Sequence, residues 1–146
     1  MIVVRGCAFP DELSYHVGHN VWLREERGIV TLGATSYGVA LASEFVSFRP
    51  KPEGTTVAAN GSVGLIELWK TLVSVRSPIA GTIVQGNAAA AADPAVINRE
   101  PYGAGWLVRL NVADWPTVSA PLVTGAAIGP AFEAAMALDK FEGPGK

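Results

Sequence analysis

The chain has 146 residues, a formal net charge of −2 and a single cysteine. This length predicts one domain with its own hydrophobic core, and the charge argues against a nucleic-acid-binding surface, which needs clustered Lys and Arg side chains. The sequence has no apolar run of the roughly 18 residues that a membrane span requires, so we expect a soluble, unprocessed protein of the reducing cytoplasm, in which the unpaired Cys7 has no role.

The first predicted strands form a hairpin. Apolar residues 21–23 and the segment 28–33 flank the charged residues 24–27, which predict a solvated turn between two antiparallel strands. We expect this pair to open the fold. Thr35 follows, and its hydroxyl is suited to accept a hydrogen bond in the first turn of a short helix that extends to residues 41–42.

The middle of the chain contains an internal repeat. Residues 46–60 and 73–87 align without a gap at a spacing of 27 positions. Seven of the fifteen aligned pairs are identical: Val46/Val73, Ser47/Ser74, Arg49/Arg76, Gly54/Gly81, Thr55/Thr82, Val57/Val84 and Asn60/Asn87. Each copy reads as a strand, a proline-containing turn and a second short strand. Two such copies predict a sheet sandwich with an approximate two-fold axis.

The segment between the two copies is a predicted hairpin. Residues 62–69 alternate imperfectly between apolar and polar side chains, and residues 72–73 resume the strand pattern. Lys70 lies in the turn between them. We therefore expect its ammonium group to be exposed at the apex of the hairpin, where other molecules can reach it.

A short helix and a strand follow the repeat. Asp93 is suited to cap a helix that starts at Pro94, because proline at the first helical position loses an amide that has no partner there. Pro101 ends this helix, since proline disfavours helical geometry at the preceding residue. Residues 105–110 form the next predicted strand.

Beyond residue 116 the composition shifts to Ala, Gly and Pro. We interpret residues 116–129 as a linker. Phe132, Met136 and Phe141 recur at near-helical spacing and predict a helix over residues 130–141. This helix is expected either to pack back on the sandwich or to be disordered.

Three short motifs carry a resemblance to a known family. Glu67 lies three positions before Lys70, and a Pro-x-x-Gly motif at 78–81 begins eight positions after it. Residues 98–106 read Asn-Arg-Glu-Pro-Tyr-Gly-Ala-Gly-Trp, and residues 19–23 read His-Asn-Val-Trp-Leu. In order and in spacing, these motifs resemble the glycine cleavage system H protein family.

The resemblance covers about residues 9–115. It implies an all-β barrel-sandwich hybrid of the lipoyl- and biotinyl-carrier type, with short helices and a pseudo-two-fold repeat, over residues 1–115. Residues 116–146 would then form a linker and a C-terminal helical extension. The resemblance further implies that Lys70 carries lipoate in amide linkage, and that Glu67 is recognised by the ligase that attaches it.

The implied function is that of a carrier rather than an enzyme. A lipoylated Lys70 would shuttle a covalently bound intermediate between partner enzymes, after loading by a lipoate ligase or lipoyl-assembly enzymes. Biotin is the competing cofactor, because biotin carriers use a similar sandwich. They have Met-Lys-Met at the apex, whereas residues 69–71 here read Trp-Lys-Thr, so we favour lipoate.

The sequence also departs from typical H proteins, which have small residues before the lysine. This chain has Leu68 and the bulky Trp69, which either covers the base of the hairpin or contacts a partner. Residues 5–10, 35–37 and 47–51 resemble the lipoate-binding paralogues associated with heterodisulfide-reductase-like sulfur oxidation. That resemblance implies an arm that carries sulfur-containing intermediates.

Three functional hypotheses therefore remain. The first is delivery of sulfur intermediates to a heterodisulfide-reductase-like complex. The second is transfer of an aminomethyl group among glycine cleavage enzymes, and the third is an interaction module without lipoate. A metal site is not expected: His16 and His19, three residues apart in a predicted extended segment, do not share a face.

Overall fold

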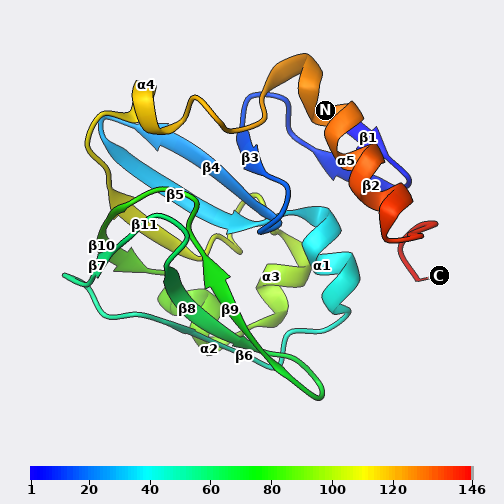
Figure 1. Cartoon of the computed structure of the whole chain (residues 1–146). Helices are drawn as coiled ribbons and strands as arrows, with labels where there is room; N and C mark the ends of the chain where they lie inside the picture. The colour runs from blue at the N-terminus through cyan, green and yellow to red at the C-terminus, as the bar shows by residue number, and fades with distance from the viewer. Residues whose placement is uncertain (146) are drawn as a thin grey trace.

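The computed structural model describes residues 1–145 and consists mainly of β-strands with short helices between them (Figure 1). The strands are β1 (Ile2–Val4), β2 (Cys7–Phe9), β3 (Ser14–His16), β4 (Val21–Glu26), β5 (Ile29–Ala34), β6 (Ser47–Pro50), β7 (Thr56–Val57), β8 (Ser62–Glu67), β9 (Leu72–Arg76), β10 (Gly81–Gly86) and β11 (Val108–Asn111). The helices are α1 (Ser36–Ala42), α2 (Ala88–Ala92), α3 (Ala95–Arg99), α4 (Trp115–Val118), the 3-10 turn η1 (Gly125–Ala127) and α5 (Ile128–Leu138).

Two sheets enclose the main core. One is six-stranded, in the order β3-β4-β5-β11-β10-β7, and the other is three-stranded, in the order β6-β8-β9. Every neighbouring pair in both sheets is antiparallel. Buried side chains of the larger sheet, such as Leu32 and Ile83, belong to one hydrophobic cluster with Phe48, Ile66 and Val75 of the smaller sheet. The expected mainly β architecture with short helices is confirmed.

The repeat in the sequence is also a repeat in the structure. The first copy contributes β6 to the three-stranded sheet and then β7 to the six-stranded sheet, and the second copy contributes β9 and β10 in the same order. β6 and β9 flank β8 on its two sides, while β7 and β10 pair with each other. The two copies therefore each cross once from the small sheet to the large one.

The start of the chain differs from expectation. The hairpin β1-β2 and the strand β3 precede β4, so the β4-β5 pair does not open the fold. The charged residues 24–26 are not a turn, because they continue β4 and pair with residues 29–31 of β5. The turn is formed by Arg27 and Gly28 alone, at φ values of 54° and 83°. Two successive left-handed residues match the twist of a two-residue hairpin.

The predicted first helix is confirmed as α1, with Thr35 as its cap: the Gly38 N–H donates to the Thr35 hydroxyl at 3.0 Å. The second predicted helix, α3, ends before Pro101 as expected, but its start is different. Pro94 occupies the cap position, and the Asp93 carboxylate accepts a hydrogen bond from Arg99 at 3.3 Å instead of capping the helix.

The C-terminal segment packs back on the sheets. Within the expected linker, α4 and η1 form, and Val123 exchanges two 2.9 Å backbone hydrogen bonds with Tyr15 of β3. α5 begins at Ile128 and lies beside the β1-β2 hairpin (Figure 1). Its buried residues Phe132 and Met136 join a second hydrophobic cluster. No helix in residues 1–145 is both long enough and apolar enough to cross a bilayer.

Candidate functional site

The predicted hairpin around Lys70 is present. β8 ends at Glu67, which pairs with Leu72 of β9, and the Leu68 N–H donates to the Thr71 carbonyl at 2.8 Å across the turn. Lys70 is exposed, and it forms no ion pair with any carboxylate of residues 1–145. The turn joins two neighbouring strands of one sheet and thus presents the primary amine of Lys70 to solvent.

Trp69 also projects into solvent. Its side chain is 82 % exposed, so the interpretation that it covers the base of the hairpin is wrong. Leu72, 66 % exposed, lies across the same turn. Two large apolar side chains therefore flank Lys70 at the apex, where they are available to a partner protein.

Glu67 lies on the outer face of the three-stranded sheet. Side chains alternate along β8, so that Glu67 is exposed while Ile66 is buried in the main core. The Glu67 carboxylate accepts a hydrogen bond from the Ser47 hydroxyl at 3.1 Å, and the Glu67 carbonyl accepts one from the Val46 N–H at 2.8 Å. The structure thus brings Glu67 and Lys70 together on one exposed turn.

The Pro-x-x-Gly motif after Lys70 fixes the path of the chain into β10. Ser77 is buried, and its hydroxyl donates to the Ile79 carbonyl at 2.7 Å while accepting from the Ile79 N–H at 3.2 Å. A Cβ atom at Gly81 would lie 2.8 Å from the Asn111 carbonyl of β11. The motif is therefore structural, because it lets β10 pair closely with β11.

The motif at residues 98–106 is structural as well. The Tyr102 hydroxyl donates to the Ala8 carbonyl at 2.6 Å and accepts from the Ser36 N–H at 2.8 Å. Burial raises the pKa of this phenol above its usual value. The indole of Trp22, fully buried, donates to the Pro101 carbonyl at 2.9 Å. Through these contacts, Tyr102 and Trp22 hold neighbouring segments of the fold together.

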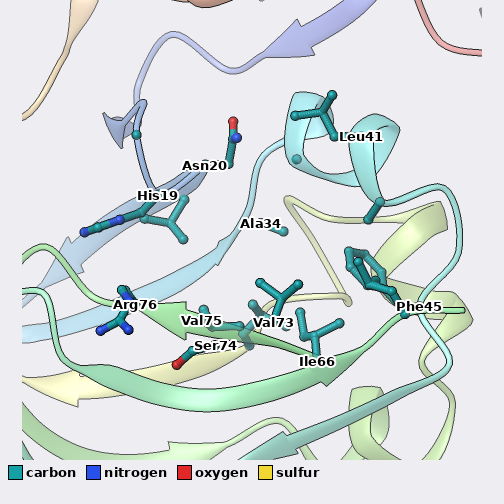
Figure 2. A pocket seen from close by; sticks show the side chains of 16 residues that line it. His19, Asn20, Ala34, Leu41, Phe45, Ile66, Val73, Ser74, Val75 and Arg76 are labelled. Carbon is teal, nitrogen blue, oxygen red and sulfur yellow. The ribbon is translucent and has the colours of Figure 1, made fainter. Parts of the chain in front are cut away.

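A cavity of about 430 Å³ lies beside the hairpin (Figure 2). It is bounded by β9, α1 and the turn before β4. β9 is the edge strand of its sheet, which explains why four consecutive residues, 73–76, line the cavity whichever way their side chains point. Leu41 and Phe45 lie at one end, and His19 and Arg76 lie at the other (Figure 2).

His16 and His19 do share a face, contrary to expectation. Their rings stack with centroids 4.0 Å apart, because residues 17–20 form a turn in which the Asn20 N–H donates to the Val17 carbonyl. The His19 N–H donates to His16 Nδ1 at 2.9 Å. Burial, and then the neighbouring His19, lower the pKa of His16, so His16 favours its neutral form. Of the two histidines, His19 lines the cavity.

Sequence reasoning missed His19 and Arg76 as cavity residues. Arg76 is exposed at the end of β9, and its Nη1 donates to the Asn60 carbonyl at 3.0 Å. His19 Nε2 lies 2.9 Å from the Asn60 side-chain oxygen. Asn60 therefore joins two groups that are 57 positions apart in the chain, a contact for which the sequence contains no signal.

Comparisons with known proteins agree on one family. The family model described as "Glycine cleavage H-protein" matches residues 13–133. The chain is 36% identical over 118 residues to glycine cleavage system H protein 5 of Aquifex aeolicus, a match that covers 78% of this chain and 80% of the relative. It is 37% identical over 107 residues to the glycine cleavage system H protein of Thermobifida fusca, covering 73% and 84% respectively.

A solved structure agrees as well. The crystal structure of a glycine cleavage system H protein from Mycobacterium marinum superposes with a TM-score of 0.74 at 32% identity, covering 86% of this chain and 99% of that chain. Because the identity exceeds 30% across most of both chains, the comparison supports a shared family and not only a shared fold. The chain belongs to the glycine cleavage H-protein family of non-catalytic lipoyl carriers.

Proposed function

We propose that Lys70 is the lipoyl attachment site and that the chain shuttles a covalently bound intermediate between partner enzymes. Proteins of this family carry lipoate covalently on a lysine. The observation that supports Lys70 as that lysine is its exposure at the apex of the β8-β9 hairpin. An amine there is accessible to a modifying enzyme, while paired strands on both sides hold it in position.

The residues around Lys70 suit such a group. The Lys70 amine is without a carboxylate partner among residues 1–145, so amide formation breaks no ion pair of the fold. Glu67, exposed on the same turn, is the proposed recognition residue for the ligase. When attached, lipoate supplies a disulfide that takes up a transferred group as one sulfur becomes a thiol. The protein supplies position, a docking surface and the neighbouring cavity.

Two kinds of cargo fit a carrier of this family. The names of the relatives favour an aminomethyl group passed among glycine cleavage enzymes. The three segments that resemble sulfur-oxidation paralogues favour sulfur-containing intermediates and a heterodisulfide-reductase-like partner. We propose the carrier function for both cases.

Intact-mass spectrometry tests the attachment site. The full chain is incubated with a lipoate ligase, ATP and lipoate, and we expect one lipoyl adduct on the wild type and none on Lys70→Arg. Lys51→Arg is the matched control, since Lys51 is also an exposed lysine next to a turn and is expected to leave the adduct intact. A wild type that stays unmodified, while a known H protein is lipoylated in the same mixture, would favour the interaction module without lipoate.

A further inference from the structure

The outer face of the three-stranded sheet leads directly to the turn that contains Lys70 (Figure 1). Directly opposed residues of antiparallel strands have their side chains on the same face. Two rows of opposed residues make up this outer face: Ser47, Glu67 and Leu72 next to the turn, and Arg49, Leu65 and Ser74 behind them. The core side chains Phe48, Ile66 and Val75 belong to the opposite face. The outer face and the turn therefore form one continuous surface.

The part of this surface behind the turn is basic. Arg76 follows two residues after Ser74 on β9, so its side chain lies on the same face, and both Arg49 and Arg76 are exposed. Neither arginine forms an ion pair with a carboxylate of residues 1–145. One hydrogen bond, to the Asn60 carbonyl, uses only part of the donor set of Arg76. At ordinary sheet spacings the two Cα atoms are about 12 Å apart, with Leu65 between them.

The part of the surface next to Lys70 is apolar. Trp69 in the turn and Leu72 at the start of β9 are exposed, and Leu65 extends the apolar strip along β8. Of the charged residues on the three strands, all of which the structure describes, Glu67 alone is acidic. The surface thus combines an apolar strip, one carboxylate and two guanidinium groups that have no carboxylate partner within residues 1–145.

We propose that this surface docks the ligase that loads Lys70. The ligase is expected to have an apolar pocket for Trp69 and acidic side chains opposite Arg49 and Arg76. This inference rests on the proposed attachment of lipoate at Lys70. A ligase that reaches both the Lys70 amine and the Glu67 carboxylate must lie over the outer face, because the Glu67 side chain points away from the core. An interface of ordinary size buries about 800 Å² on each partner, which is enough to extend from the turn to the two arginines.

Each part of the surface has a separate role in such docking. A large aromatic side chain in a desolvated pocket supplies much of the binding energy of a protein interface, and Trp69 is the exposed aromatic residue at the turn. Guanidinium groups pair with carboxylates through two parallel hydrogen bonds and so fix the orientation of the partner. Because the chain has a net charge of −2, acidic side chains are attracted by this patch and not by the protein as a whole.

A fixed orientation also selects one lysine. Lys51 is exposed as well, but it follows the end of β6 that is remote from the turn. It lies four residues beyond Ser47, or about 13 Å at the usual strand rise. A ligase anchored on Trp69 therefore has the Lys70 amine within its active site and Lys51 outside it.

Lipoylation kinetics test the basic part of the surface. The unmodified full chain is the varied substrate of the ligase, with ATP and lipoate at saturation, and the product is quantified by intact-mass spectrometry. We expect Arg49→Gln/Arg76→Gln to raise KM for the chain about fivefold at low salt and to leave kcat unchanged, because the two side chains act in docking and not at the amine. The salt dependence of kcat/KM should become weaker in the same variant.

Arg27→Asn/Arg99→Gln is the matched control, since it removes two positive charges from exposed sites outside this face. Arg27 lies in the β4-β5 turn with a φ of 54°, which asparagine tolerates. Arg99 ends α3, and its exposed ion pair with Asp93 contributes little to stability. Wild-type kinetics are expected for this control. Melting temperatures are compared first, so that every kinetic comparison is made between folded proteins.

Trp69 is tested in the same assay. We expect Trp69→Ala to raise KM about tenfold and Trp69→Phe to restore most of the loss, since phenylalanine keeps an aromatic anchor. Lys70→Arg provides a second readout, because it keeps the surface but cannot be loaded. Titration calorimetry of the ligase with Lys70→Arg should show increases in Kd of similar size when Trp69→Ala or the arginine substitutions are added.

The remaining outcomes count against the proposal. Equal KM values for the Arg49/Arg76 variant and its control, or an unchanged KM for Trp69→Ala, would overturn the docking surface while leaving Lys70 as a lipoyl carrier. A loss confined to kcat would place these side chains at the chemical step and would also overturn docking. A wild type that the ligase does not load at all would overturn the carrier function, and the docking surface with it.

Discussion

Glu67 ends β8 with its carboxylate in solvent, three positions from the proposed attachment site. Its side chain has one hydrogen bond, from the Ser47 hydroxyl, and that bond is exposed. Exposed polar contacts of this kind contribute little to folding, because water replaces them at almost no cost. If the Glu67 carboxylate has a strong effect on lipoylation, that effect must therefore come from its contact with another protein.

We accordingly expect Glu67→Ala to lower the rate of lipoylation several-fold while changing the free energy of unfolding by no more than about 0.5 kcal/mol. The rate is measured by intact-mass spectrometry at limiting ligase, and the stability by urea unfolding. Ser47→Ala is the control, since it removes the same hydrogen bond but leaves the carboxylate. A large stability loss in Glu67→Ala would instead assign Glu67 a structural role.

Some residues of the proposed site could be predicted from the sequence, and others could not. Lys70 and Glu67 could be singled out because their spacing within a motif, and between two repeats, is a property of the chain. The exposure of Trp69 could not, since an aromatic residue at a turn satisfies packing or docking equally well. Nor could the contacts that His19 and Arg76 each make with Asn60, which has a left-handed backbone.

Asn60 and Asn87 occupy equivalent positions in the two copies of the repeat, but they have different structural roles. Both end their repeat copy, but Asn87 has φ of −79° and caps α2, accepting from the N–H groups of Ala89 and Ala90. Its amide nitrogen also donates to the Ala104 and Trp106 carbonyls, at 2.8 Å and 2.7 Å. Asn87 thus connects the end of the repeat to the segment that leads into β11.

Asn87→Ala should be costly. The side chain is 4 % exposed, so its loss removes a helix cap and leaves two carbonyls without their partner. We expect a loss of about 2–4 kcal/mol in the free energy of unfolding, measured with urea. Asn111→Ala, at an exposed strand end, should cost less than about 0.5 kcal/mol. Similar values for the two variants would contradict the capping role.

Elements with a clear period or cap signal were predictable, and those without one were not. α1 follows from Thr35 and an apolar pattern, and the β8-β9 hairpin follows from alternation on both sides of a turn. α2 consists of five alanines, which have no polar side to reveal a period, although alanine has the highest helix propensity. The sequence around and after residue 116 likewise did not reveal α4 or η1; Trp115 and Val118 of α4 pack against the main core.

Two separate hydrophobic clusters stabilise different parts of the whole molecule. The main one lies between the two sheets and reaches the hairpin through Ile66 and Val75. The second lies under α5, where Phe132 stacks on Phe9 at 4.0 Å and meets the edge of Tyr15 at 5.5 Å. Since Lys70 is on the first cluster's sheet, the C-terminal helix can stabilise the protein without contacting the proposed site.

Phe132→Ala should therefore separate stability from loading. Phe132 is fully buried, and truncation at such a site costs about 3–5 kcal/mol through lost burial and an unfilled cavity. We expect a correspondingly lower urea midpoint, but a wild-type rate of Lys70 lipoylation when the assay is run where the variant is still folded. Leu138→Ala, on the same helix but 84 % exposed, should change neither quantity. If Phe132→Ala instead slowed lipoylation in the folded protein, α5 would have to influence the hairpin through the sheets, and the two clusters could not be treated as independent.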